Sequence, residues 1–322
     1  MLFFLGMLKY TWSCRFELSC LTSVLGESRF AVPWSYGRLG GLHSFINHAQ
    51  YFGYLLPSIT IVMAHLVKRV DWRVAISAAF SLVFMLFVIQ DGGRRIVGMV
   101  LGSALLVWAL LLPKIEFRHV LRLGVAAILL LVLMQLMVIY RSPGLQAIWE
   151  GGEIQLEYDS SFIKVDANFK DMVSLVEIFP NEKEFLGAKP LLYVLVRPIP
   201  RAIWSGKPTD RGFDLGKYQG KRATLTTSAV GDWYIMWGWF SVFFGGVLTG
   251  GLAQMANAFL NGRRIPARRL MFALSAMTLF VGLRALHEVV ILGYSVLAVA
   301  LLLWLRRQYY GGPSKTGRRA AL

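Results

Sequence analysis

Long apolar runs separated by short basic connectors recur along this sequence, and they restrict its fold more than any other feature. Each run approaches the roughly 20 residues that an α-helix needs to cross a hydrocarbon core. Of the 322 residues, 56% are hydrophobic and 16% are charged, a composition typical of integral membrane proteins. We therefore expect an all-α integral membrane protein.

The runs predict about seven transmembrane helices, four before and three after one long polar segment. The expected spans are 51–67, 74–90, 96–113, 119–140, 232–260, 270–287 and 289–305. The chain then divides into a poorly defined N-terminal segment (1–50), a first membrane bundle (51–140), a large loop (141–231), a second membrane bundle (232–305) and a basic tail (306–322).

The connectors between the runs predict the orientation of the chain. Lys and Arg number three in 68–73, three in 114–122, four in 261–269 and five in the tail. All four segments fall on one side of a seven-span topology, and cytoplasmic connections are enriched in these residues. We therefore expect a cytoplasmic C-terminus and a large loop on the outer face. Arg94, Arg95 and Arg284 lie in outer turns that should be poor in cations, so their presence there needs a separate reason.

The large loop is acidic in its first half and basic in its second. Apolar residues at three- and four-residue steps predict an amphipathic helix over 161–179, and a second short helix is expected over 190–196. The following segment, 197–212, is stiffened by three prolines. It presents Arg197, Arg201, Trp204, Lys207, Asp210, Arg211 and Gly212. The planar guanidinium fork suits a phosphate or diphosphate, whereas the alternative is that these cations contact lipid headgroups.

Ionisable residues interrupt the apolar run that surrounds Arg284. Such a residue is costly in a membrane unless it faces a partner or a water-filled cavity. Arg284 either forms a structural ion pair with Glu288, or it lines the same cavity as Arg94 and the loop arginines, with His287 or Glu288 available as a proton acceptor. The DGGRR turn at 91–95 is likewise either a simple helix terminus or part of that cavity.

The sequence lacks residues that several functional classes of protein require. The net charge of +16 is spread between apolar runs and not along one stripe, which does not favour nucleic-acid binding. The histidines show no metal-ligand spacing, and phosphate-loop, dinucleotide and nucleophile-elbow motifs are missing. We expect no functional role for Cys14 and Cys20. Few buried acids and no evident inverted repeat weigh against a secondary transporter.

Two segments together resemble the oligosaccharide repeat unit polymerases of the Wzy type, which are related to the O-antigen ligases. They are DANFKDMVSLVEIFPNEKEFLGAKPLLYVLVRPIPRAIWSGKP (166–208) and TTSAVGDWYIMWGWFSVFFGGVLTGGL (226–252). The resemblance extends over about 74–260. It matches the family's arginine, ten residues, glycine motif to Arg201 and Gly212, its glycine–acid pair to Gly231 and Asp232, and its earlier outer-face arginine to Arg94 or Arg95.

This resemblance implies a metal-independent, cofactor-free glycosyltransferase with a GT-C-like fold in the bacterial inner membrane. Its substrate would be a polyprenyl-diphosphate-linked oligosaccharide, which it would polymerise at the outer face, alongside flippase and chain-length regulator proteins. We expect Arg201 and Arg94 to hold the diphosphate, Arg211 and Arg284 to support them, and Asp232, Asp210 or His287 to assist the acceptor. Further substrate contacts are expected from Arg197, Trp204, Lys207, Gly212, Arg95 and Arg222.

The resemblance also leaves alternatives open. Family members have more spans, so we expect an N-terminal portion to be missing, and an inactive remnant is one alternative. A ligase that moves a finished glycan is a second. A lipid-linked oligosaccharide transporter or binding protein, in which the arginines bind the headgroup without chemistry, is a third.

Overall fold

The computed structural model describes residues 1–27, 31–36, 42–67, 71–91, 93–139, 168–208, 210–220, 225, 227–261 and 265–310, which form helices and no strand. The expected all-α fold is confirmed for this part of the chain. Five helical segments are long and apolar enough to cross a membrane: Phe45–Val67, Trp72–Gln90, Arg94–Leu111, Phe117–Met137 and Trp239–Asn257. In lipid, a helix satisfies its own backbone hydrogen bonds, so runs of this length and composition fold as helices.

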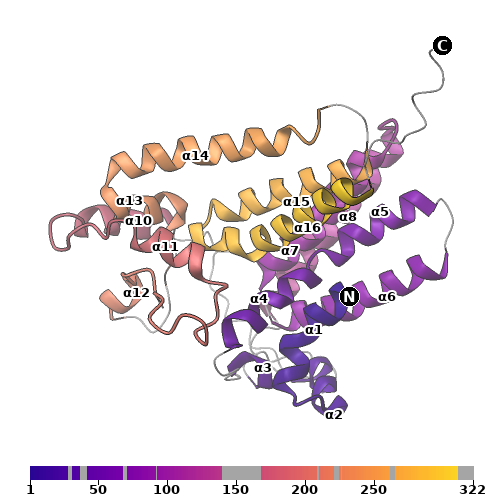
Figure 1. The fold of residues 1–322 in the computed structure, drawn as a ribbon, viewed down its shortest axis with the longest axis horizontal. Helices are drawn as coiled ribbons and strands as arrows, with labels where there is room; N and C mark the ends of the chain where they lie inside the picture. Colours follow the sequence, from indigo (N-terminus) through magenta and orange to yellow (C-terminus); the bar gives the residue numbers. More distant parts are fainter. Residues whose placement is uncertain are drawn as a thin grey trace.

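The described elements follow one another as a chain of long helices broken by a group of short ones (Figure 1). The first half holds α1 (Leu2–Ser13), α2 (Leu18–Leu21), η1 (Thr22–Leu25), α3 (Pro33–Tyr36), α4 (His43–Gly53), α5 (Leu56–Val67), α6 (Trp72–Gln90), α7 (Arg94–Leu111) and α8 (Phe117–Ile139). The second half holds α10 (Asn168–Ile178), α11 (Lys189–Val196), α12 (Leu215–Tyr218), α13 (Ser228–Trp237), α14 (Trp239–Asn257), α15 (Pro266–Gly282), η3 (Leu286–Glu288) and α16 (Val289–Tyr310).

Helix α7 lies at the centre of the bundle, where it packs against α5, α6, α8 and α15. Val97, Val100 and Val107 recur on its buried side and join the main hydrophobic core. Ser103 of α7 and Ser58 of α5 share a buried hydrogen bond of 2.9 Å, which satisfies both hydroxyls inside that core. Because α7 contacts most of the bundle, its first turn is fixed in position.

The N-terminal segment packs on the bundle, with α1 against α4 and α6. Phe3, near the start of α1, stacks on Phe80 with ring centroids 4.3 Å apart. Tyr10, near the end of α1, contacts Phe87 with ring centroids 4.7 Å apart. Lys9 and Tyr10 donate hydrogen bonds to Asp91 at 3.1 and 3.2 Å. Helix α1 thus runs alongside α6 toward the C-terminal end of α6.

A disulfide joins Cys14 and Cys20 just beyond the end of α1. The sequence analysis assigned these two cysteines no role, so the bond corrects that expectation. Because α1 runs toward the end of α6, the disulfide lies at the same end of the bundle as Asp91 and the start of α7.

The short helices α10, α12 and α13 share a hydrophobic core of their own. Leu175 of α10, Phe179 just after that helix, Leu215 of α12 and Ile235 of α13 are buried together. The hydroxyl of Tyr234 donates a 3.1 Å hydrogen bond to the carbonyl oxygen of Phe179, which ties α13 to the segment after α10. The expected helix over 190–196 is confirmed as α11, and the amphipathic helix is confirmed over 168–178, since residues 161–167 lie outside the described part.

Gly238 divides the fifth expected span, which starts at 232 in the sequence analysis, into two helices. Its φ of 67° and ψ of −146° are open to glycine and not to residues with a side chain. Residues before it form α13, which packs on α10, and residues after it form α14. Glycines in an apolar helix permit close packing. Within α14 this holds for Gly245, which lies against the ring of Trp233, whereas Gly246, Gly250 and Gly251 face open space.

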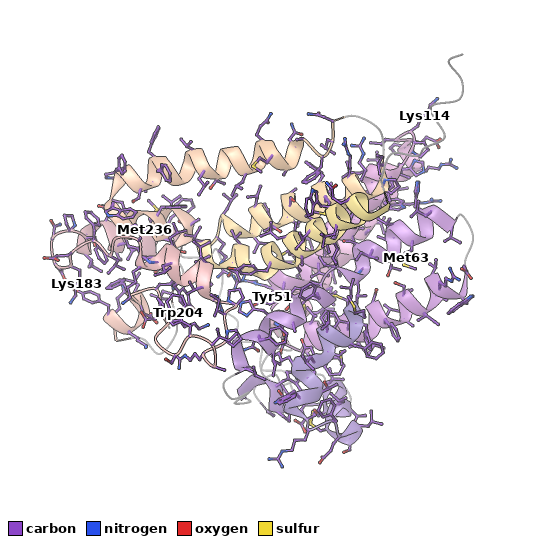
Figure 2. The ribbon with its side chains drawn as sticks, viewed as in Figure 1. Tyr51, Met63, Lys114, Lys183, Trp204 and Met236 are labelled. Atoms are coloured by element: carbon purple, nitrogen blue, oxygen red, sulfur yellow. A yellow bond between two sulfur atoms is a disulfide. The ribbon has the colours of Figure 1, made fainter. Side chains whose placement is uncertain are left out.

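The two ends of the bundle differ in character. The C-terminal ends of α5, α7 and α14 lie at the right of Figure 1, and α10, α11, α12 and α13 lie at the left. Lys114 marks the first end in Figure 2, whereas Lys183 and Trp204 mark the second. The basic connectors and the short helices therefore occupy opposite ends.

Candidate functional site

A cavity of about 530 Å³ opens among the short helices, beside the start of α7, the end of α11 and η3. A volume of this size accommodates a small-molecule or cofactor-sized group. Its lining residues are Arg95, Tyr193, Arg197, Asp210, Arg211, Gly212, Phe213, Asp214, Lys217, His287 and Glu288. The charged side chains in this set include four cations, and they come from segments on both sides of residues 140–167.

Arg95 enters the cavity from the first turn of α7. Gly93 precedes the helix, and the backbone N–H groups of Ile96 and Val97 bond to its carbonyl oxygen, which starts α7 at this point. The guanidinium of Arg95 forms an ion pair with Glu288 of η3, whose side chain is only 5% exposed. This pair joins the central helix of the bundle to the turn between α15 and α16.

Arg197 caps the C-terminal end of α11 and lies one helical turn after Tyr193. Its guanidinium carbon stands 5.7 Å from the centre of the Tyr193 ring. Within the described residues Arg197 has no carboxylate partner, unlike Arg95 and Arg211. Arg197 is therefore the cavity arginine whose fork is most available to an anion.

Arg211 is anchored from behind by Asp232 of α13. The Nη1 of Arg211 donates to Oδ1 of Asp232 at 2.8 Å, and the backbone N–H of Leu286 donates to Oδ2 at 2.8 Å. Burial raises the pKa of the Asp232 carboxyl, while Arg211 and the Leu286 N–H act in the opposite direction. Asp232 thus ties the basic loop to η3 from outside the cavity lining.

A tight turn presents Arg211 to the cavity. Gly212 follows it with a φ of 94°, and a Cβ there would meet the Lys189 side chain at 3.0 Å. Asp210 accepts the Gly212 N–H at 2.7 Å and lies 3.8 Å from the Lys189 ammonium. The Asp210 side chain is 72% exposed, so this pair belongs to the solvent-facing rim.

The His287 side chain lies in a region of positive potential inside the site. Burial, with Arg211, Arg197, Arg95 and Arg284 around it, lowers the pKa of His287 to about 3. Its Nδ1 is buried and has no hydrogen-bond partner among the described residues. The imidazole is therefore neutral near pH 7 and has hydrogen-bonding capacity to offer.

Lys207 has a different environment from the one expected of a substrate contact. Its ammonium donates to the carbonyl oxygens of Arg197, at 3.0 Å, and of Ile199. Burial, with Arg201 and Arg197 nearby, lowers the pKa of Lys207. The residue therefore fixes the turn after α11 from inside, which positions Arg197.

Six of the expected site residues line the cavity, and the others lie around it or elsewhere. The lining residues are Arg95, Arg197, Asp210, Arg211, Gly212 and His287. Asp232 and Lys207 support the cavity from behind, and Arg284 acts on His287 electrostatically. Arg94, Arg201 and Trp204 are exposed and outside the lining, and Arg222 lies outside the described residues.

Four lining residues were absent from the expected set, and Glu288 appeared in it only as an optional proton acceptor. The four are Tyr193, Phe213, Asp214 and Lys217. The four-residue step from Tyr193 to Arg197 is a signal that the sequence contains, because it places both side chains on one helix face. Asp214 accepts the Lys217 N–H at 3.2 Å as the N-cap of α12, a pairing that needs the helix boundary to be known.

The arrangement is suited to an anionic group with polar neighbours. One unpaired arginine, an exposed lysine and two arginines with buried counterions surround a space with an aromatic wall. Among the described residues, no group of three His, Cys, Asp or Glu side chains could hold a metal ion. A negative charge on a bound group would meet the guanidinium and ammonium groups that line the cavity.

No protein-family model, no curated protein and no solved structure matches this chain.

Proposed function

We propose that the protein is a glycosyltransferase that polymerises polyprenyl-diphosphate-linked oligosaccharide repeat units. The observation that carries the proposal is the cavity of about 530 Å³ in which Arg95, Arg197 and Arg211 meet. Planar guanidinium forks pair well with diphosphate oxygens. The resemblance of 166–208 and 226–252 to repeat unit polymerases adds the reaction class.

The chemistry requires stabilisation of a leaving group. When the glycosidic bond to the diphosphate breaks, the leaving oxygen gains negative charge, and preorganised cations in a partly dehydrated site stabilise it. Arg197 is the best placed residue for this role, because no carboxylate of the described chain competes for its fork. Arg211 and Lys217, which line the same cavity, add positive charge.

Two independent observations support an outer-face site. The connectors at the opposite end of the bundle are rich in Lys and Arg, as cytoplasmic connections are. The Cys14–Cys20 disulfide lies at the cavity end, and disulfides persist in oxidising compartments such as the periplasm. We therefore assign the cavity to the outer face of a bacterial inner membrane.

The proposal is tested with purified protein reconstituted in liposomes together with a lipid-linked repeat unit from its own source. Gel analysis of the glycan should show a ladder of lengthened products. Arg197→Ala should lower the rate of extension about 100-fold or more, the scale expected on removing one donor to a developing anion. Arg122→Ala, which removes an exposed arginine from α8 at the other end of the bundle, should leave the ladder unchanged.

A second variant, Arg201→Ala, distinguishes the diphosphate site implied by the resemblance from the site indicated by the cavity. Arg201 is the arginine that the resemblance assigns to the diphosphate, yet it lies on an exposed turn outside the cavity lining. Extension that survives Arg201→Ala and is lost in Arg197→Ala would favour the cavity. A wild-type protein that binds the lipid-linked unit without ever lengthening it would overturn the polymerase assignment in favour of a transporter or binding protein, and a single transfer to another acceptor would indicate a ligase.

A further inference from the structure

The carboxylates around the cavity differ in their surroundings. This difference determines which of them can take the proton from the acceptor hydroxyl. Glycosyl transfer from a diphosphate requires that this proton leave as the new bond forms. The sequence offers Asp232, Asp210, His287 and Glu288 as acceptors. The structure places the first three in settings poorly suited to that role.

Asp232 is occupied on both sides. Its two carboxylate oxygens accept hydrogen bonds from Arg211 and from the Leu286 N–H, each at 2.8 Å, and its side chain is only 2% exposed. It is also absent from the cavity lining. A hydroxyl in the cavity therefore has no path to either oxygen without disruption of α13 and η3.

Asp210 and Asp214 lie at the rim of the cavity. Asp210 is largely exposed and accepts the Gly212 N–H, whereas Asp214 caps the first turn of α12. Water competes for carboxylates in such positions, and their fixed hydrogen bonds point them at the backbone. His287 lines the interior, but burial, together with the four arginines around it, lowers the pKa of its imidazole to about 3 and makes it a weak base.

Resting on the proposed function, we infer that Glu288 is the catalytic base that takes the proton from the acceptor hydroxyl. Glu288 lines the cavity, is 5% exposed, and is held at the wall by its ion pair with Arg95. Arg95 from α7 contacts it, and the cavity that it lines is shared with Arg197 and Tyr193 from α11, Arg211 from the loop, and His287 beside it. Arg95 thus orients the base, and Arg197 remains for the diphosphate.

The step balances without a further reagent. The O–H bond of the acceptor breaks as its proton passes to a Glu288 oxygen, and the acceptor oxygen bonds to the anomeric carbon of the donor sugar. The bond from that carbon to the diphosphate oxygen breaks, and its electron pair leaves with the polyprenyl diphosphate beside Arg197. After product release, Glu288 returns its proton to water.

The test uses the reconstituted full-length protein with the lipid-linked repeat unit. Glu288→Gln, which keeps the shape of the side chain, should lower kcat about 100-fold or more while KM changes little. Glu288→Asp should retain part of the activity. The matched control is Glu184→Gln, because Glu184 is an exposed carboxylate at the same end of the molecule and outside the cavity lining.

Two readouts separate a base from a residue that only holds Arg95. Glu288→Ala should regain activity when formate is added, since the small carboxylate can occupy the vacated space. The acidic limb of the pH profile of kcat should disappear in Glu288→Gln. Full activity of Glu288→Gln, or an unrescued Glu288→Ala variant that binds the lipid-linked unit normally, would overturn the inference.

The outcome for the wild-type protein keeps this inference separate from the proposed function. If the wild type makes no ladder, the polymerase proposal fails. If the wild type makes a ladder that Glu288→Gln reproduces at full rate, the polymerase proposal stands and the assignment of the base fails.

Discussion

Individual charged residues at this site act mainly through the partners that hold them. Arg95 and Arg211 each have a buried carboxylate, Glu288 or Asp232, whereas Arg197 has a tyrosine ring. Burying a charge costs several kcal/mol unless an opposite charge and hydrogen bonds compensate it. The pairs therefore fix two arginines in place and leave the third for a ligand.

Loss of the Asp232 carboxylate should destabilise the fold. Asp232→Asn removes the counterion of Arg211, so we expect the free energy of unfolding to fall by about 3 kcal/mol, the scale for breaking a buried pair. Thermal unfolding in detergent measures the effect. Asp210→Asn is the matched control, because its rim pair with Lys189 is exposed and should be worth less than about 1 kcal/mol; equal losses in the two variants would contradict this account.

Sequence reasoning located the charged residues but not their partners. It collected the loop arginines from their density along the chain, and it could not rank Arg197 above Arg201, because that ranking depends on where α11 ends relative to η3. The Asp232–Arg211 pair joins residues 21 positions apart, and the Arg95–Glu288 pair joins the two halves of the chain. Tertiary packing alone decides such pairings.

At the scale of elements, apolar periodicity predicted the helices well and their breaks poorly. The predicted spans 74–90 and 96–113 lie within two residues of α6 and α7 at both ends. The break at Gly238 was missed because glycines in an apolar run also suit helix packing. Only the backbone conformation distinguishes these uses of glycine, and at Gly238 it separates α13, which carries Asp232, from the membrane-length α14.

A pair of glycine substitutions tests the role of this break. Gly238→Ala forces a side chain into a conformation with φ of 67° and brings a Cβ to 3.0 Å from the Phe185 ring, so we expect a loss of about 1–3 kcal/mol in unfolding free energy. Gly246→Ala places a methyl group in open space within α14 and should be neutral or stabilise by up to about 1 kcal/mol. Chemical unfolding in mixed micelles compares them, and a stable Gly238→Ala variant would show that the bend is not required.

At the scale of the whole molecule, the two ends of the bundle carry different kinds of residue. The end with Lys114 carries the basic connectors, and the opposite end carries the disulfide and the cavity. The charge pattern of the sequence predicts that the basic end faces the cytoplasm, and this orientation stays a prediction. The disulfide, which the sequence analysis missed because no motif surrounds the cysteines, points to the same orientation by a separate physical argument.

Labelling with a membrane-impermeant maleimide tests the orientation in intact cells. Both native cysteines are bonded to each other, so they do not react, and single new cysteines report their own location. Glu184→Cys, in the turn after α10, should label from outside, and Lys114→Cys, in the α7–α8 connection, should label only after the membrane is permeabilised. The reverse pattern would place the cavity in the cytoplasm and contradict the assigned reaction.

The central position of α7 has a consequence for genetics. A straight helix of 18 residues is about 27 Å long, and Arg95 occupies its first turn while α5, α8 and α15 grip the remainder. A packing change at Ser103, or at Gly102 against the Met277 side chain, would displace Arg95 as effectively as a substitution beside the cavity. Screens for inactive alleles will therefore return core positions along α7 together with site residues, and protein abundance alone will not tell the two groups apart.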